Sequence, residues 1–218
     1  MPYSLTEDYE RFDNVVEAVN REKPAFTVHV GDTKSGGSPC SNETVQHTWD
    51  SFSKFDHPLV YTPGDDEWTD CHRKAVVSMD PLERLSVIRD RFFGSSRSWG
   101  GGTPIEIKIQ STDTNWRDYP ENRMWIRDGV VFTTLHIIGS HNNNQPDVPG
   151  AVEEFVARDN ANEAWLENTF AKARNLDAPS LAIFIPGFTR FFEQLCELTI
   201  AFSKPVMVSH EGSHYFRV

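Results

Sequence analysis

Acidic, imidazole and amide side chains follow four apolar runs at the point where each run stops. Residues 26–32 (FTVHVGD) end in Gly and Asp32, and residues 59–67 (LVYTPGDDE) end in a Pro-Gly break and three acids. Residues 130–144 (VVFTTLHIIGSHNNN) and 205–214 (PVMVSHEGSH) end in histidines together with asparagine or glutamate. Short apolar runs rich in β-branched residues are typical of buried strands. The chain therefore places polar groups at four strand ends.

These four strand ends could meet at one site. In an open α/β sheet, ligands bind outside the carboxyl ends of the strands. Carboxylate oxygen and imidazole nitrogen are ligands that suit Zn, Mn, Fe or Mg. The sequence therefore predicts a site for divalent metal ions rather than a glycine-rich nucleotide loop.

Composition narrows the classes of partner. The chain has 218 residues, of which 32 are acidic and 21 basic, and its formal net charge is −11. A nonspecific nucleic-acid binder or a protein of anionic membrane surfaces needs a basic face, so we expect neither partner. An anionic substrate is compatible with this charge, because a bound metal ion inverts the local field. No apolar stretch is long enough to span a bilayer, and the first ten residues lack the basic and apolar parts of a signal peptide, so we expect a soluble chain.

Three cysteines are too few for a disulfide scaffold. Cys40 and Cys71 each follow a strand end that is expected at the site, so they could pair, and a disulfide would indicate a secreted or periplasmic protein. The alternative is two reduced thiols in a cytoplasmic protein. Cys196 lies in the apolar segment 191–202, and we expect it to pack against the core.

Helices and strands that position these groups alternate along the chain. Apolar spacing, caps and proline positions predict helices over residues 4–23, 42–55, 80–92, 152–174 and 191–202. Apolar or alternating runs predict strands over residues 26–32, 59–62, 105–109, 121–125, 130–138, 181–185 and 205–209. A turn at residues 127–129 makes a hairpin, so the α/β fold is expected to have a mixed sheet.

The ordered series VGD, PGDDE, a strand with His and Asn, and SHEGSH resembles the calcineurin-like metallophosphoesterases. Their blocks run Asp-x-His, Gly-Asp, Gly-Asn-His-Asp/Glu, His and Gly-His-x-His. The chain is most similar to an uncharacterised, usually exported branch of that superfamily whose blocks read GD and GDNEWxDC. The resemblance spans nearly the whole chain, and VHVGD and YTPGDDEWTDC carry most of it. It implies a metallophosphoesterase-type mixed β-sandwich flanked by helices, and hydrolysis of a phosphomonoester or phosphodiester.

The resemblance also implies roles for individual residues. Asp32 matches the carboxylate that bridges two metal ions, Asp65 matches the Asn ligand of the second metal, and His214 matches a His ligand of the first. His210 is a further candidate ligand, one position before the family's other terminal His. Asp66 stands where the family has its catalytic His, and it can act as an acid only if its pKa is raised. Two divalent ions (Mn, Zn, Fe or Mg) would activate a water that attacks a small phosphorylated substrate.

His141 and Asn142 follow the strand predicted over residues 130–138. They could line the substrate cleft, and the alternative is a simple Asn-rich turn.

The chain also departs from the family pattern. Its Asp-x-His block would precede Met1, and no histidine directly follows the strand over residues 181–185. We therefore expect a single phosphoesterase domain over residues 1–218 that is incomplete at both termini and lacks the first strand. Lost ligands suggest a second class of function, a degenerate non-catalytic relative that serves as a binding or structural module. A metal-dependent phosphoesterase is the first expectation.

Overall fold

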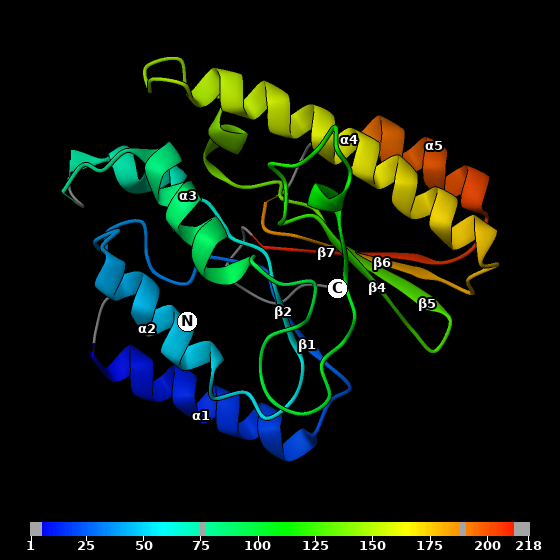
Figure 1. Cartoon of the computed structure of the whole chain (residues 1–218), viewed down its shortest axis with the longest axis horizontal. Helices are drawn as coiled ribbons and strands as arrows, with labels where there is room; N and C mark the ends of the chain where they lie inside the picture. Colours follow the sequence, from blue (N-terminus) through cyan, green and yellow to red (C-terminus); the bar gives the residue numbers. More distant parts are fainter. Residues whose placement is uncertain (1–5, 75–76, 188–190, 212–218) are drawn as a thin grey trace.

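The structure is a computed structural model that describes residues 6–74, 77–187 and 191–211, and Figure 1 shows helices on the outer sides of its strands. The helices are α1 (Thr6–Glu22), α2 (Asn42–Phe52), α3 (Pro81–Phe92), α4 (Ala151–Asn175) and α5 (Phe192–Phe202), and short 3-10 helices are η1 (Thr69–His72), η3 (Gln110–Thr112) and η4 (Ser140–Asn143). The strands are β1 (Thr27–His29), β2 (Leu59–Tyr61), β3 (Lys108–Ile109), β4 (Arg123–Arg127), β5 (Val130–Thr134), β6 (Leu181–Ile185) and β7 (Val206–His210).

The strands form two sheets. β1 and β2 pair in parallel, whereas the larger sheet has the order β3-β4-β5-β6-β7 and contains both antiparallel and parallel pairs. The expected hairpin is confirmed, because β4 and β5 are antiparallel and the turn between them has left-handed backbone at Asp128 (φ 50°) and Gly129 (φ 83°). An Asp-Gly pair tolerates that backbone, which matches the twist of the flanking strands.

The predicted helices and strands are present, although four strands are shorter than expected and α2 ends at Phe52 instead of residue 55. The strands cover only Thr27–His29 of residues 26–32, Leu59–Tyr61 of residues 59–62, Lys108–Ile109 of residues 105–109, and Val130–Thr134 of residues 130–138. Residues 105–107 bond instead to residues 96–98. The apolar run past β5 is buried all the same, since Ile137 and Ile138 each expose no more than 3% of their surface. An apolar run therefore indicates that its residues are buried, but it does not show how many of them pair within a strand.

Aromatic and branched side chains fill the space between the two sheets. Val28 of β1 and Val60 of β2 belong to the same apolar cluster as Trp125 of β4, Phe132 of β5 and Phe184 of β6. The rings of Trp125 and Phe132 stack with their centroids 5.6 Å apart. One face of the small sheet therefore packs on one face of the larger sheet.

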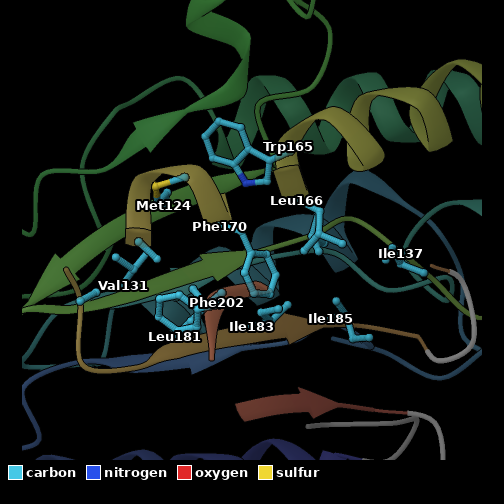
Figure 2. Close-up of a cluster of buried hydrophobic side chains, with 13 residues drawn as sticks. Met124, Val131, Ile137, Trp165, Leu166, Phe170, Leu181, Ile183, Ile185 and Phe202 are labelled. Carbon is cyan, nitrogen blue, oxygen red and sulfur yellow. The ribbon is translucent and has the colours of Figure 1, made fainter. Parts of the chain in front are cut away.

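Helices cover the outer face of each sheet. Helices α1, α2 and α3 pack against β2 through a cluster that includes Phe52 and Ile88. On the other side, Trp165 and Phe170 of α4 and residues of α5 pack onto Ile183 of β6, as Figure 2 shows for α4 and the sheet. The chain is thus a mixed α/β protein with helices outside two sheets. Among the described residues, no helix combines the length and the apolar character that crossing a bilayer requires.

Cys40 and Cys71 form a disulfide, which is one of the two alternatives for this pair. Both residues are buried, and the bond links the loop after β1 to η1. The expectation for Cys196 is wrong, because its side chain is exposed. Leu195 and Leu198 face the core, and the position that follows Leu195 is turned about 100° around the helix axis, away from it.

Two glycines allow the loops after β1 and β2 to touch. Gly31 has a φ of 102°, and a Cβ on it would overlap the backbone N and Cα of Gly64. A Cβ on Gly64 would in turn overlap the carboxylate of Asp32, whose own backbone is left-handed (φ 50°). The close contact of the loops therefore requires glycine at both positions, and it places the Asp32 carboxylate against the second loop.

We expect Gly31→Ala to lower the free energy of unfolding by about 2 to 4 kcal/mol, because the new Cβ meets both an unfavourable φ and the backbone of Gly64. Gly94→Ala is the matched control, since a Cβ at that exposed glycine has no neighbour within 4 Å, and it should change stability by less than about 0.5 kcal/mol. Urea denaturation of both variants measures the difference. Equal stabilities would show that the two loops separate at little cost.

Candidate functional site

The buried carboxylate of Glu67 ties together the loops after β1 and β2. Its oxygens accept hydrogen bonds from the backbone N–H groups of Asp32 (3.2 Å), Thr33 (2.8 Å) and Gly64 (3.0 Å). The hydroxyl of Tyr61 donates a fourth bond (3.1 Å). A carboxylate has about four acceptor positions, so the loops take up the hydrogen-bonding capacity of this group. Glu67 therefore shapes the site.

Three aspartates gather next to Asp32. One carboxylate oxygen from each of Asp65, Asp66 and Asp70 lies within 4.8 Å of the others, and this group could hold a metal ion. The hydroxyl of Ser140 lies 2.7 Å from a carboxylate oxygen of Asp65 and 2.7 Å from one of Asp70. The backbone N–H of Asp66 lies 3.5 Å from Oδ1 of Asp32, which places the first loop beside the group. Oxygen ligands of this kind suit hard cations such as Mg and Mn.

Ser140 reaches the aspartates from a turn with unusual backbone. Residues 140–143, which form η4, all have φ between 46° and 65°. Left-handed backbone costs an L-residue on the order of 1 kcal/mol, and less for Asn. Arg158 of α4, which is fully buried, offsets this cost by donating to Oδ1 (2.7 Å) and to the carbonyl oxygen (2.9 Å) of Asn142. Hydrogen bonds from Arg158 of α4 therefore hold this turn in position.

Glu211 adds a carboxylate from the larger sheet. It directly follows β7, and its side chain is close enough to Asp32 to exchange a hydrogen bond with it. Its Oε2 is enclosed and has no hydrogen-bond partner among the described residues. An enclosed acceptor of this kind fits contact with a cation or with water.

The crowded carboxyl groups bind protons tightly. Burial and the neighbouring Glu67 and Glu211 raise the pKa of Asp32 to about 10. Burial, Glu67 and Asp65 raise the pKa of Asp66 to about 7, and burial and Glu67 raise the pKa of Glu211 to about 8. Each value lies above the usual range because the charged form is poorly solvated and is repelled by other negative charges. A divalent cation would relieve the same repulsion.

Two basic side chains lie beside these acids. Lys34 is buried, its ammonium group donates to the carbonyl oxygen of Ser35 (3.0 Å), and burial lowers its pKa against the opposing effect of Asp66. Arg73 is half-exposed, and its Nη2 lies 2.7 Å from a carboxylate oxygen of Asp70. These two groups are outnumbered by the carboxyl groups of Asp32, Asp65, Asp66, Glu67, Asp70 and Glu211.

Part of the predicted site is brought together. Asp32, Asp65 and Asp66 are neighbours, because they follow adjacent parallel strands. His210 ends β7, and its exposed ring has Nδ1 2.8 Å from the carbonyl oxygen of Glu211. His214 lies outside the described residues.

The two residues predicted to line a substrate cleft, His141 and Asn142, differ in their exposure to solvent. His141 is exposed and adjoins Ser140. Asn142 is buried, where its side chain accepts from Arg158 and from the N–H of Ile138 (3.1 Å) and donates to Asp159 (3.2 Å). The side chain of Asn142 therefore holds the turn, as the Asn-rich turn alternative describes.

Sequence reasoning missed Asp70 and Ser140 as members of the site, and it treated Glu211 only as one of the polar groups at a strand end. Asp70 stands four residues after Asp66 within the DEWTDC motif, and that one-turn spacing is a signal that could have found it. Ser140 gives no such signal, because its place depends on the left-handed turn. Glu211 is visible at a strand end, but the adjacent His210 is the more typical metal ligand.

We expect the metal-free protein to lose stability as the pH rises from about 5 to 9. A folded-state pKa above the unfolded one, near 4 for a carboxyl group, means that the folded state binds the proton more tightly. The resulting stabilisation is complete below the unfolded pKa and is lost as the pH rises through the folded values of about 7 for Asp66, 8 for Glu211 and 10 for Asp32.

Asp66→Asn removes one such group and should stabilise the protein in EDTA at pH 8 by about 1 kcal/mol or more, with a smaller gain at pH 5. Asp118→Asn, at an exposed carboxylate, is the control and should show no such trend. Urea denaturation at several pH values provides the measurement. A gain that does not grow with pH would contradict the assigned repulsion.

Comparison of the chain with protein-family models, with curated proteins and with solved structures finds no match.

Proposed function

We propose that this chain is a metal-dependent phosphoesterase of the calcineurin-like type, which hydrolyses a small phosphomonoester or phosphodiester. The observation that carries the proposal is the meeting of Asp32, the Asp65-Asp66-Asp70 group and Glu211 at the carboxyl ends of strands from both sheets. The order of these acids along the chain follows the GD and GDDEWTDC motifs that resemble the superfamily. Two sheets between outer layers of helices support the corresponding sandwich fold.

The donor set fits divalent cations. Asp65, Asp66 and Asp70 would hold one cation, and the neighbouring carboxyl groups of Asp32 and Glu211 would supply further oxygen ligands. Carboxylate oxygens favour Mg or Mn among the candidate metals, whereas Zn and Fe would draw on imidazole as well. When bound, such ions polarise a phosphoryl oxygen and lower the pKa of a coordinated water, which supplies the attacking hydroxide.

The other polar groups hold the acids in position for this role. Glu67 keeps the Asp32 loop against the Asp65 loop, and Ser140 keeps Asp65 beside Asp70. Asp66 has two possible tasks. Its pKa near 7 lets the carboxyl carry a proton for a leaving oxygen at neutral pH in the metal-free protein, but a bound cation withdraws that proton. Asp66 therefore acts either as a ligand or as an acid, and not as both at once.

A second candidate function is a cation-binding module without turnover. The observation that favours it is the ligand type, since within residues 6–74, 77–187 and 191–211 the group that could hold a metal is made of aspartates alone. Carboxylates without an imidazole acid can bind a cation tightly and yet leave the departing oxygen without a proton donor.

Mn at millimolar concentration should raise the melting temperature of the purified chain, and EDTA should lower it. We expect Mn-dependent hydrolysis of an aryl phosphate, and Asp32→Asn should reduce kcat/KM by roughly 100-fold or more because a metal ligand is lost. Asp118→Asn, an exposed carboxylate outside the site, is the control and should keep the wild-type rate. Melting curves, elemental analysis and initial rates provide the measurements.

The outcomes separate the two candidates. Mn binding with turnover that Asp32→Asn abolishes supports the phosphoesterase. Mn binding without turnover supports the cation-binding module. An unchanged melting temperature with either Mn or EDTA, together with no turnover, contradicts both.

A further inference from the structure

We propose that Arg73 binds the phosphoryl group of the substrate, an inference that rests on the proposed function and adds a substrate-binding residue to it. Arg73 follows η1 and forms an ion pair with Asp70 of the aspartate group. Its side chain is 47% exposed, whereas that of its partner Asp70 is 3% exposed. The guanidinium is thus the basic group through which an anion from solvent can meet the site.

Some N–H groups of the Arg73 guanidinium have no hydrogen-bond partner among the described residues. Nη2 lies 2.7 Å from a carboxylate oxygen of Asp70 and 3.4 Å from the hydroxyl of Ser140. Among the described residues, Nη1 and Nε donate no hydrogen bond that would compete with a ligand. A guanidinium with free N–H groups can hold two oxygens of a phosphoryl group at once, which an ammonium cannot do.

The loop after β1 packs against one side of the guanidinium. A Cβ on Gly36 would lie 2.7 Å from Oδ1 of Asp66 and 2.9 Å from Nη1 of Arg73. The loop therefore passes directly over the guanidinium and the acids at a residue without a side chain. A phosphoryl group would therefore meet the guanidinium on its exposed side, beside its ion-pair partner Asp70.

Lys34 cannot serve the same purpose. Its side chain is buried, and its ammonium group is bonded to the carbonyl oxygen of Ser35. Its charge acts on Asp66, Glu67, Asp70 and Asp32. Lys34 therefore balances part of the internal negative charge, and Arg73 is left to face an incoming anion.

Asp70 connects the binding of a cation with the availability of the Arg73 guanidinium. The same carboxylate is the ion-pair partner of Arg73 and a member of the group that could hold a metal ion. A divalent cation bound to Asp70 competes with the guanidinium for that carboxylate. Loading the site with a cation then frees the guanidinium for the phosphoryl group, so cation and substrate binding favour each other.

The test compares wild type with Arg73→Ala and Arg73→Lys, with Arg97→Ala as the control. Arg97 is also an exposed arginine in an ion pair, with Glu106 at 3.2 Å. The probe is inorganic phosphate, measured as the competitive inhibition constant in the Mn-dependent aryl-phosphate assay and as a binding constant by calorimetry on the Mn-loaded protein. Mn affinity is measured in parallel by metal titration followed by thermal melting.

We expect Arg73→Ala to weaken phosphate binding and to raise KM by about 10- to 100-fold, the range for lost charge-assisted hydrogen bonds. Arg73→Lys should recover only part of this loss, because it cannot form the paired contact. Mn should bind Arg73→Ala at least as tightly as it binds wild type, since the competing cation is gone. Arg97→Ala should match wild type in every measurement.

Unchanged phosphate binding and KM in Arg73→Ala, with turnover intact, would overturn the role of Arg73 and leave the phosphoesterase in place. Loss of Mn binding in the same variant would also overturn it, because Arg73 would then be supporting the acids rather than the substrate. A wild-type protein that neither turns over aryl phosphate nor binds phosphate with Mn present would remove both proposals.

Discussion

Four hydrogen bonds converge on the carboxylate of Glu67, three from the backbones of two loops that follow separate strands and one from the hydroxyl of Tyr61. The bonds satisfy N–H groups that the close approach of Gly31 and Gly64 would otherwise leave buried without partners. They also bring Asp32 beside the Asp65-Asp66-Asp70 group, although carboxylates repel one another. Glu67 is itself an acid in this cluster, so the interaction that assembles the site also adds to its negative charge. The geometry of the other acids depends on this single buried group.

Protons and cations are two competing means by which the negative charge of the site can be neutralised. Protons do so in the metal-free protein, as the raised pKa values of Asp32, Asp66 and Glu211 indicate. Bound cations would do so by displacing those protons, and Lys34 and Arg73 already provide part of the balance. Because the surrounding loops are fixed by hydrogen bonds and by the Cys40–Cys71 disulfide, the acids cannot simply move apart. A rigid frame that holds like charges together is favourable for binding a divalent ion.

Much of this arrangement could be predicted from sequence, because strand ends and acidic motifs are local signals. The apolar run before Gly31-Asp32 and the Pro63-Gly64 break identified the two loops, and parallel pairing of β1 with β2 places their ends together. The position of Ser140 could not be predicted in this way, because it depends on a left-handed turn held by Arg158, a distant residue on α4. The exposure of Cys196 was hidden for a similar reason, since apolar character does not tell which face of α5 meets the sheet.

Asp32 and Glu211 lie near opposite ends of the described chain, yet their carboxyl groups are neighbours. Contacts between residues so far apart in the sequence slow folding, although the entropic cost of closing the loop grows only slowly with its length. A cation that bridges the two residues would bind the finished fold and not its precursors.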